Sequence, residues 1–210
     1  MISIGQGFAW GPKGGLSLGQ QSEQSYQKDI LLAYHGALYM ESLSEEDKYA
    51  LFAQIGYHQR GSALRTQRFI VNGNIIPART RKSTFNNIVL QLGGKQKFPL
   101  GDFSKFYFGV ALRGEYNVST DLSLIYRNQE DLVTKFVYGA TASVGLQRMF
   151  SELVGVIVEF NVHPDFSDQI IVPAQRSFPD QTRIIPETRI RNITYELSLG
   201  FRFLRKVIYE

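Results

Sequence analysis

Cysteine is absent from this 210-residue sequence, which excludes a disulfide framework, a thiol nucleophile and a cysteine-based zinc site. Charged residues make up only 20% of the chain and aromatic residues 13%, a composition that does not fit a disordered chain. No run approaches the roughly 18 consecutive apolar residues of a membrane-spanning helix. A helical membrane protein is therefore excluded. A membrane β-barrel is not, because its strands alternate apolar and polar residues.

The sequence does contain segments in which apolar and polar residues alternate, as in a strand with one apolar face. In residues 193–203 every odd position is apolar or aromatic, and every even position is polar, charged or glycine. Several segments reach about ten residues, which is longer than most globular strands and suits a tilted strand that crosses a bilayer. All seven prolines fall outside the predicted strands, as expected of a residue that cannot donate to a strand ladder. Eight strands are predicted, around residues 16–18, 30–41, 49–60, 87–95, 106–116, 136–146, 154–162 and 193–203.

Alternation alone does not say which face points inward. In a soluble barrel or sandwich the apolar face forms the core, whereas in a membrane barrel it faces lipid. Three features favour the membrane barrel: small residues on the polar face, such as Gly109 and Ala111, aromatic residues at the strand ends, and connections that alternate in length. The long connections are residues 20–28, 61–84, 118–135 and 164–190, and the short ones are 42–47, 98–104 and 149–152. We therefore predict an all-β fold, an eight-stranded antiparallel up-and-down transmembrane β-barrel with short periplasmic turns and long external loops.

Four short motifs resemble one known family. The stretch Gly11-Pro12-Lys13-Gly14-Gly15-Leu16-Ser17-Leu18 is similar to the G-x-K-G-G-L-N-L opening of the Bacteroidota outer-membrane β-barrel family, the porin-family small barrels that include the PorT-type proteins. Residues 54–62 resemble the family's E-L-x-Y-x-Q-K-G strand, and residues 85–90 stand where members carry Y-L-x-I-P-L, with Val89 in place of proline. Residues 195–203 resemble a terminal strand read by the outer-membrane assembly machinery, although the chain continues past it. The resemblance implies the barrel fold and the bacterial outer membrane, but no activity, because members of the family differ in role.

Residues 11–210 are predicted to form a single barrel domain, and residues 1–10 a residual signal or N-terminal segment. Residues 1–9 have no basic region and only a short apolar stub, so a full signal peptide is not recognised there. Either the sequence begins inside a signal peptide or the protein is soluble. We favour a truncated signal peptide, because Gly14-Gly15 starts the barrel so soon afterwards.

The predicted interior face carries charges of both signs. Small barrels fill their interior with side chains, and buried charges must be paired. The predicted lumen network of ion pairs consists of Arg60, Arg113, Glu115, Glu159, Glu196 and Arg202. An interior this full does not suit general solute diffusion, although its many small residues leave room for a narrow path.

A catalytic interpretation of the interior is also conceivable. Lipid-modifying outer-membrane enzymes use a serine or histidine with a carboxylate. The candidate bases here are His35, His58 and His163, the carboxylates are Glu41, Glu115, Glu159 and Glu196, and the hydroxyls are Ser17, Ser143 and Ser198. No spacing ties these residues together, so no catalytic residue and no enzymatic activity are predicted. His163, Asp165 and Asp168 could hold a cation, but their spacing is not diagnostic, and a solvated loop is expected there. No metal or cofactor is predicted.

The connection 61–84 is predicted to be an external basic loop, because residues 60–82 contain six basic residues and no acidic one. Such a loop would contact lipopolysaccharide phosphates, and nucleic acid is in the wrong compartment. Apolar residues on both sides of Asn72-Gly73 predict a hairpin. This hairpin either extends the barrel wall or forms a surface for a partner protein, and residues 164–190 hold a second apolar patch of this kind. The basic residues of the predicted loop are Arg65, Arg68, Arg79, Arg81 and Lys82.

The predicted function is that of a non-enzymatic outer-membrane barrel. It would be structural or adhesive, or an accessory subunit of a complex such as secretion or uptake machinery, and would present residues 61–84 and 164–190 at the surface. A lipid-modifying outer-membrane enzyme is one alternative, and it requires a Ser/His/Glu cluster at the external rim. A soluble lipocalin-like barrel is another, and its apolar face would enclose an apolar ligand.

Overall fold

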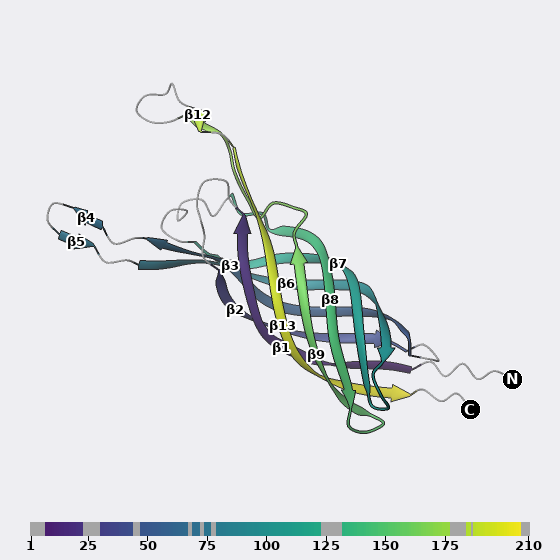
Figure 1. Cartoon of the computed structure of the whole chain (residues 1–210). Helices are drawn as coiled ribbons and strands as arrows, with labels where there is room; N and C mark the ends of the chain where they lie inside the picture. Colours follow the sequence, from purple (N-terminus) through teal and green to yellow (C-terminus); the bar gives the residue numbers. More distant parts are fainter. Residues whose placement is uncertain are drawn as a thin grey trace.

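Eight long strands form one closed antiparallel sheet in the computed structural model (Figure 1). Each strand pairs with the next one along the barrel, and the last pairs with the first. This confirms the predicted barrel. The strands are β1 (Gly7–Ser22), β2 (Leu31–Ser42), β3 (Tyr49–Thr66), β6 (Arg79–Pro99), β7 (Ser104–Asp121), β8 (Phe136–Met149), β9 (Val154–Pro164) and β13 (Thr188–Lys206). The structure describes residues 7–22, 30–43, 47–66, 69–71, 74–76, 79–122, 132–176, 184–185 and 187–206.

The barrel carries its apolar side chains on the outside. Leu51 and Leu112 are each 73% exposed and Val110 is 67% exposed, whereas Arg60, on an inward position, is fully buried. A soluble barrel has the opposite arrangement, so the lipocalin-like alternative is wrong. Among the described residues, no helix is long and apolar enough to cross a membrane.

Aromatic pairs mark two levels of the outer surface. Near the end of the barrel that holds both termini, the ring centroids of Trp10 and Phe203 are 5.1 Å apart and those of Phe98 and Phe108 are 5.5 Å apart. Toward the other end, the corresponding distances are 6.1 Å for Tyr34–Tyr57 and 6.4 Å for Phe160–Tyr195. Two such girdles are typical of a barrel that crosses a bilayer, with one girdle at each interface.

The two ends of the barrel differ in length. Short connections join the strands at the end where the described chain starts and stops (Figure 1). Because outer-membrane barrels have short periplasmic turns, we call this the periplasmic end and the opposite one the external end. At the external end, β3 and β6 stay paired as far as Thr66 and Arg79, and β4 (Phe69–Val71) pairs with β5 (Asn74–Ile76) beyond them. The prediction of a loop over residues 61–84 is therefore wrong, whereas the hairpin is confirmed. Outside the membrane, a two-stranded ribbon does not need an apolar face. The alternation of apolar and polar residues by which a strand is recognised in the sequence is therefore weaker there.

An apolar cap covers the external end of the interior. Its buried side chains belong to Phe85, Leu122, Ile170 and Ile190. Phe85 on β6 is the register partner of Arg60 on the neighbouring strand β3. The short strand β10 (Ile170–Val172) pairs with the start of β13 and carries Ile170 into the cap. Beyond it, β11 (Gln175–Arg176) pairs with β12 (Ile184–Ile185). Part of the apolar patch that the sequence places in residues 164–190 therefore packs inside the protein.

Pro12 lies inside β1, and Pro99 and Pro164 are the last residues of β6 and β9, contrary to the expectation that every proline lies outside the strands. The ladder between β1 and β13 skips Gly11 and Pro12, because proline has no backbone N–H to donate. At this gap the hydroxyl of Tyr39 donates a hydrogen bond to the carbonyl of Phe201 over 3.1 Å. Strand β1 also begins at Gly7, so residues 7–10 belong to the barrel wall rather than to a separate N-terminal segment.

Replacing Tyr39 with phenylalanine should lower the free energy of unfolding by about 1 kcal/mol, because the Phe201 carbonyl loses its donor while the ring is kept. Urea titration of the barrel in lipid vesicles measures this change. Tyr195→Phe, on the outward face of β13, is the matched control and should have a smaller effect. Equal losses for the two variants would show that the hydroxyl of Tyr39 does not support the seam.

Candidate functional site

Charged side chains fill the interior of the barrel in two clusters. They come from inward positions on seven of the eight wall strands, all except β8, and from the turns beside them. The external cluster consists of His35, His58, Arg60, Arg113, Glu115, His163, Asp165 and Glu196. The periplasmic cluster consists of Lys13, Glu41, Asp47, Lys95, Lys97, Glu159 and Arg202.

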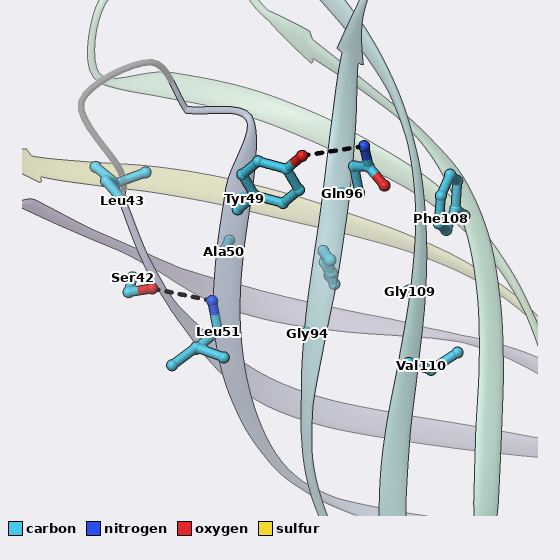
Figure 2. Close-up of a pocket in the computed structure, with 11 residues that line it drawn as sticks. Ser42, Leu43, Tyr49, Ala50, Leu51, Gly94, Gln96, Phe108, Gly109 and Val110 are labelled. Carbon is cyan, nitrogen blue, oxygen red and sulfur yellow. Dashed lines mark hydrogen bonds between the residues drawn. The ribbon is translucent and has the colours of Figure 1, made fainter.

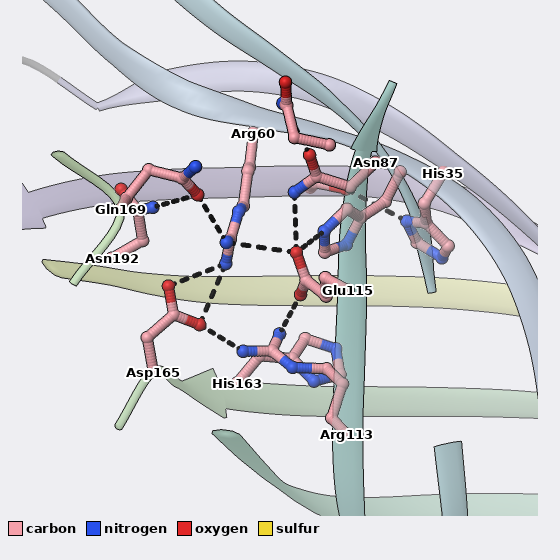
Figure 3. A network of polar contacts seen from close by, with 12 residues as sticks. His35, Arg60, Asn87, Arg113, Glu115, His163, Asp165, Gln169 and Asn192 are labelled. Carbon is pink, nitrogen blue, oxygen red and sulfur yellow. Dashed lines mark hydrogen bonds and ion pairs between the residues drawn. The ribbon is translucent and has the colours of Figure 1, made fainter. Parts of the chain in front are cut away.

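Two arginines hold two carboxylates at the centre of the external cluster (Figure 3). Arg60 Nη1 lies 2.9 and 2.8 Å from the two carboxylate oxygens of Asp165, and its Nη2 lies 3.1 Å from Glu115 Oε2. Arg113 bridges the same two acids, with its Nη1 2.9 Å from Glu115 Oε1 and its Nη2 on Asp165. Arg60 also donates to Gln169 Oε1 over 2.6 Å, which ties the segment before β10 to the interior. Two positive and two negative charges therefore neutralise one another in the buried interior.

The three histidines gather around Glu196. His58 lies between two glutamates, with Nδ1 3.0 Å from Glu196 Oε1 and Nε2 3.0 Å from Glu115 Oε2. His163 Nε2 lies 2.9 Å from the other oxygen of Glu196. Within the described residues, no group of three or more histidines or carboxylates is placed to hold a metal ion.

The fold brings together a serine, a histidine and a glutamate that no sequence spacing connects. His35 lies between two hydroxyls, with Nδ1 3.1 Å from Ser17 Oγ and Nε2 2.8 Å from Ser198 Oγ. Glu196 accepts from Ser17 over 3.4 Å and lies 3.9 Å from His35 Nδ1, so the carboxylate does not hydrogen-bond the histidine directly as in a catalytic triad. The space beside His35 and His58 is about 10 Å³, room for about one water. This cluster lies buried inside the lumen rather than at the external rim.

In the periplasmic cluster, lysines supply most of the positive charges. Glu159 binds Lys13, Lys95 and the hydroxyl of Tyr107, the last two over 3.2 and 2.7 Å. Glu41 lies 2.9 Å from both Lys97 Nζ and Arg202 Nε. Asp47, in the β2–β3 turn, bridges Lys97 and Lys105 over 2.9 and 2.7 Å. Through Asp47, this cluster therefore extends from the interior to the β2–β3 turn at the periplasmic end.

All six residues predicted for the lumen network lie buried in the interior, but only half of them pair with one another. Arg60 and Arg113 share Glu115, whereas Arg202 pairs with Glu41, Glu159 with lysines and Glu196 with histidines. The sequence interpretation placed Glu41 on the lumen face but not in the network. It missed Lys13, Asp47, Lys95, Lys97 and Asp165 as members. Lys13 and Lys97 lie just beyond the predicted strands 16–18 and 87–95. Extending these strands by two or three residues would have placed both side chains on the inward face.

Asp165 is the clearest correction among the candidate residues. The sequence places it in a solvated loop with Asp168, but its side chain is buried between Arg60 and Arg113. It follows Pro164 at the end of β9, where the chain is still on the barrel wall and pairs as far as Ile193. Asp168 does remain near the surface, 2.6 Å from Arg191 Nε.

The predicted basic loop is largely strand. Arg65 lies on β3, and Arg79, Arg81 and Lys82 lie on β6, where Ala63 pairs with Lys82 and Thr66 with Arg79. Lys82 is exposed. Arg68 lies outside the described residues. We call residues 61–84, with the tip strands β4 and β5, the external hairpin. The basic residues that the structure describes lie on its two long strands, β3 and β6.

Comparison with protein-family models gave no match, and comparison with curated proteins gave none either. Among solved structures, Neisserial surface protein A is 10% identical, with 93% of this chain and 96% of that chain covered and a TM-score of 0.51. The outer membrane protein OprG of Pseudomonas aeruginosa is also 10% identical, with 96% and 97% covered and a TM-score of 0.50. At this identity the likeness concerns the fold alone. The chain therefore has the fold of an eight-stranded outer-membrane β-barrel, and this fold, together with the exposed apolar belt, supports a location in a bacterial outer membrane.

Proposed function

We propose that this barrel is a non-enzymatic surface-presenting protein whose working element is the external hairpin. The observation that carries the proposal is that β3 and β6 remain paired to Thr66 and Arg79 and continue into β4 and β5, clear of the barrel (Figure 1). The barrel wall thus carries the external hairpin into the external space. We propose that the hairpin binds a partner protein.

The composition of the hairpin supports this proposal. A two-stranded ribbon on its own is only marginally stable in water, and the tip strands consist mainly of Phe, Ile and Val. The exposed edges of such a ribbon can accept a further strand from a partner. Its flanking basic residues suit an acidic partner and contact with lipopolysaccharide phosphates near the rim.

The interior supports a presenting role over transport or catalysis. Ion pairs fill the lumen in both clusters, and the apolar cap lies over its external end. Under this proposal the protein is an accessory subunit of a larger outer-membrane assembly, such as secretion or uptake machinery. Membership of the PorT-type family of Bacteroidota is a further part of the proposal and rests on the motifs at residues 11–18 and 54–62.

Site-specific photo-crosslinking in the native bacterium tests the proposal. A photoreactive residue at Ile70 or Ile75 should give a discrete protein adduct, because both positions lie on the tip strands. The same residue at Leu112, which faces lipid, is the control and should give none. If tip positions yield no adduct, or yield the same pattern as Leu112, the external hairpin does not bind a partner protein.

A further inference from the structure

A groove of about 430 Å³ crosses the lipid-facing wall near the periplasmic end (Figure 2). Gly94 of β6 forms its floor, between its register partners Leu51 of β3 and Val110 of β7. The next row toward the periplasm consists of Tyr49, Gln96 and Phe108. Ser42 and Leu43, at the end of β2, also line it.

Two features of the chain create this groove. Outward positions on this part of β6 carry large side chains on either side of Gly94, namely Leu92 and Gln96. Strand β2 also parts from β3 here, because their pairing ends at Glu41 and Phe52 and the N–H of Leu51 donates to the Ser42 hydroxyl instead, over 3.0 Å. A Cβ added at Gly94 would meet only the Ala50 carbonyl, at 3.9 Å. Packing within the protein therefore does not require glycine at this position.

We propose that the groove binds one acyl chain of a phospholipid from the periplasmic leaflet. The groove is continuous with the exposed apolar belt, so bilayer hydrocarbon is what meets it. Its deep end is lined by Leu51 and Val110, whereas its periplasmic end carries the Tyr49 hydroxyl and the Gln96 amide, whose nitrogen lies 3.5 Å from that hydroxyl. This order, apolar within the bilayer and polar at the interface, matches a phospholipid that enters with its headgroup at the rim.

The attraction must come from packing, because an acyl chain gains nothing from leaving one apolar medium for another. A chain seated over Gly94 contacts Leu51 on one side and Val110 on the other, whereas a chain on the convex wall elsewhere touches protein on one side only. Hydrogen bonds from the rim to the headgroup add to this. The bound phospholipid should therefore exchange more slowly than its neighbours around the barrel.

Native mass spectrometry of the full chain tests the site. The barrel is refolded into detergent micelles that contain palmitoyl-oleoyl-phosphatidylethanolamine, and the phospholipid molecules that each barrel retains are counted. Wild type should retain one, and Gly94→Leu, which fills the floor, should reduce the retained fraction at least ~10-fold, equivalent to about 1.4 kcal/mol. Gly36→Leu is the matched control, because a Cβ there meets only the Lys13 carbonyl, at 4.0 Å, on a lipid-facing position outside the groove.

Gel electrophoresis with and without boiling shows whether each variant has folded. If Gly94→Leu does not fold, Gln96→Leu at the rim provides the second variant and should also lower retention. Retention by Gly94→Leu equal to wild type, or no retention by wild type, overturns the proposal. A parallel arm with lipid A distinguishes the leaflets, since preference for lipid A over phosphatidylethanolamine would overturn the assignment to the periplasmic leaflet.

Discussion

Replacing Arg60 with methionine should lower the free energy of unfolding by about 3–5 kcal/mol, the usual cost of removing one partner from a buried ion-pair network. Arg60 contacts Asp165, Glu115 and Gln169, and its side chain is completely buried. Without it, Arg113 is left with two carboxylates to neutralise. Guanidinium or urea titration in lipid vesicles, with gel mobility as the probe of folding, measures the loss.

Two further variants separate charge imbalance from simple loss of contact. Arg191→Met removes an arginine that is paired with Asp168 but about half exposed, and should cost less than about 1 kcal/mol. Adding Asp165→Asn to Arg60→Met removes the excess carboxylate and should restore part of the lost stability. If the double variant is no more stable than Arg60→Met, the network does not act through charge balance.

Replacing Leu112 with arginine should cost about 2–4 kcal/mol, the penalty for a charge at the bilayer midplane on the lipid face of a barrel. Leu112 is 73% exposed, at the middle of the outward row of β7. On a water-soluble protein, an arginine at so exposed a position would cause little loss. The same titration in vesicles measures the difference.

Leu100→Arg provides the matched control for depth. Leu100 is also exposed, but it lies in the turn between β6 and β7, where its N–H donates to the Ser104 carbonyl. Its replacement should cost about 0–1 kcal/mol, because the side chain reaches the interface. Equal costs at the two positions would mean that the exposed belt is not immersed in hydrocarbon.

The alternation of side chains predicts most of the wall, because a strand with lipid on one side must repeat every second residue. Residues 193–203 show this period without a fault, and residues 106–116 show it with Gly114 as the one gap in the outward apolar row. The inward parity of Arg60, Arg113 and Glu115 likewise follows from the period. It places these side chains in the lumen before any contact is known.

The period does not predict where a strand ends or which charges meet. Pro12 breaks the pattern of β1, yet the strand continues through it, because Tyr39 supplies a hydrogen bond from the neighbouring strand. Asp165 is buried because of Arg60 and Arg113, which lie 105 and 52 residues away in sequence. Such partners depend on the register of the whole closed sheet, which no local segment contains.

The interruption at Gly11 and Pro12 divides the β1–β13 pairing, which closes the barrel, into two paired segments of unequal length. Four residue pairs close the periplasmic part, from Gly7–Lys206 to Trp10–Phe203, and ten close the external part, from Lys13–Gly200 to Ser22–Arg191. The short segment has few backbone hydrogen bonds to lose, so β1 and β13 should separate first on the periplasmic side while the long segment stays paired. During insertion the same asymmetry favours an order of closure in which the external part of the seam sets the register and the periplasmic part follows.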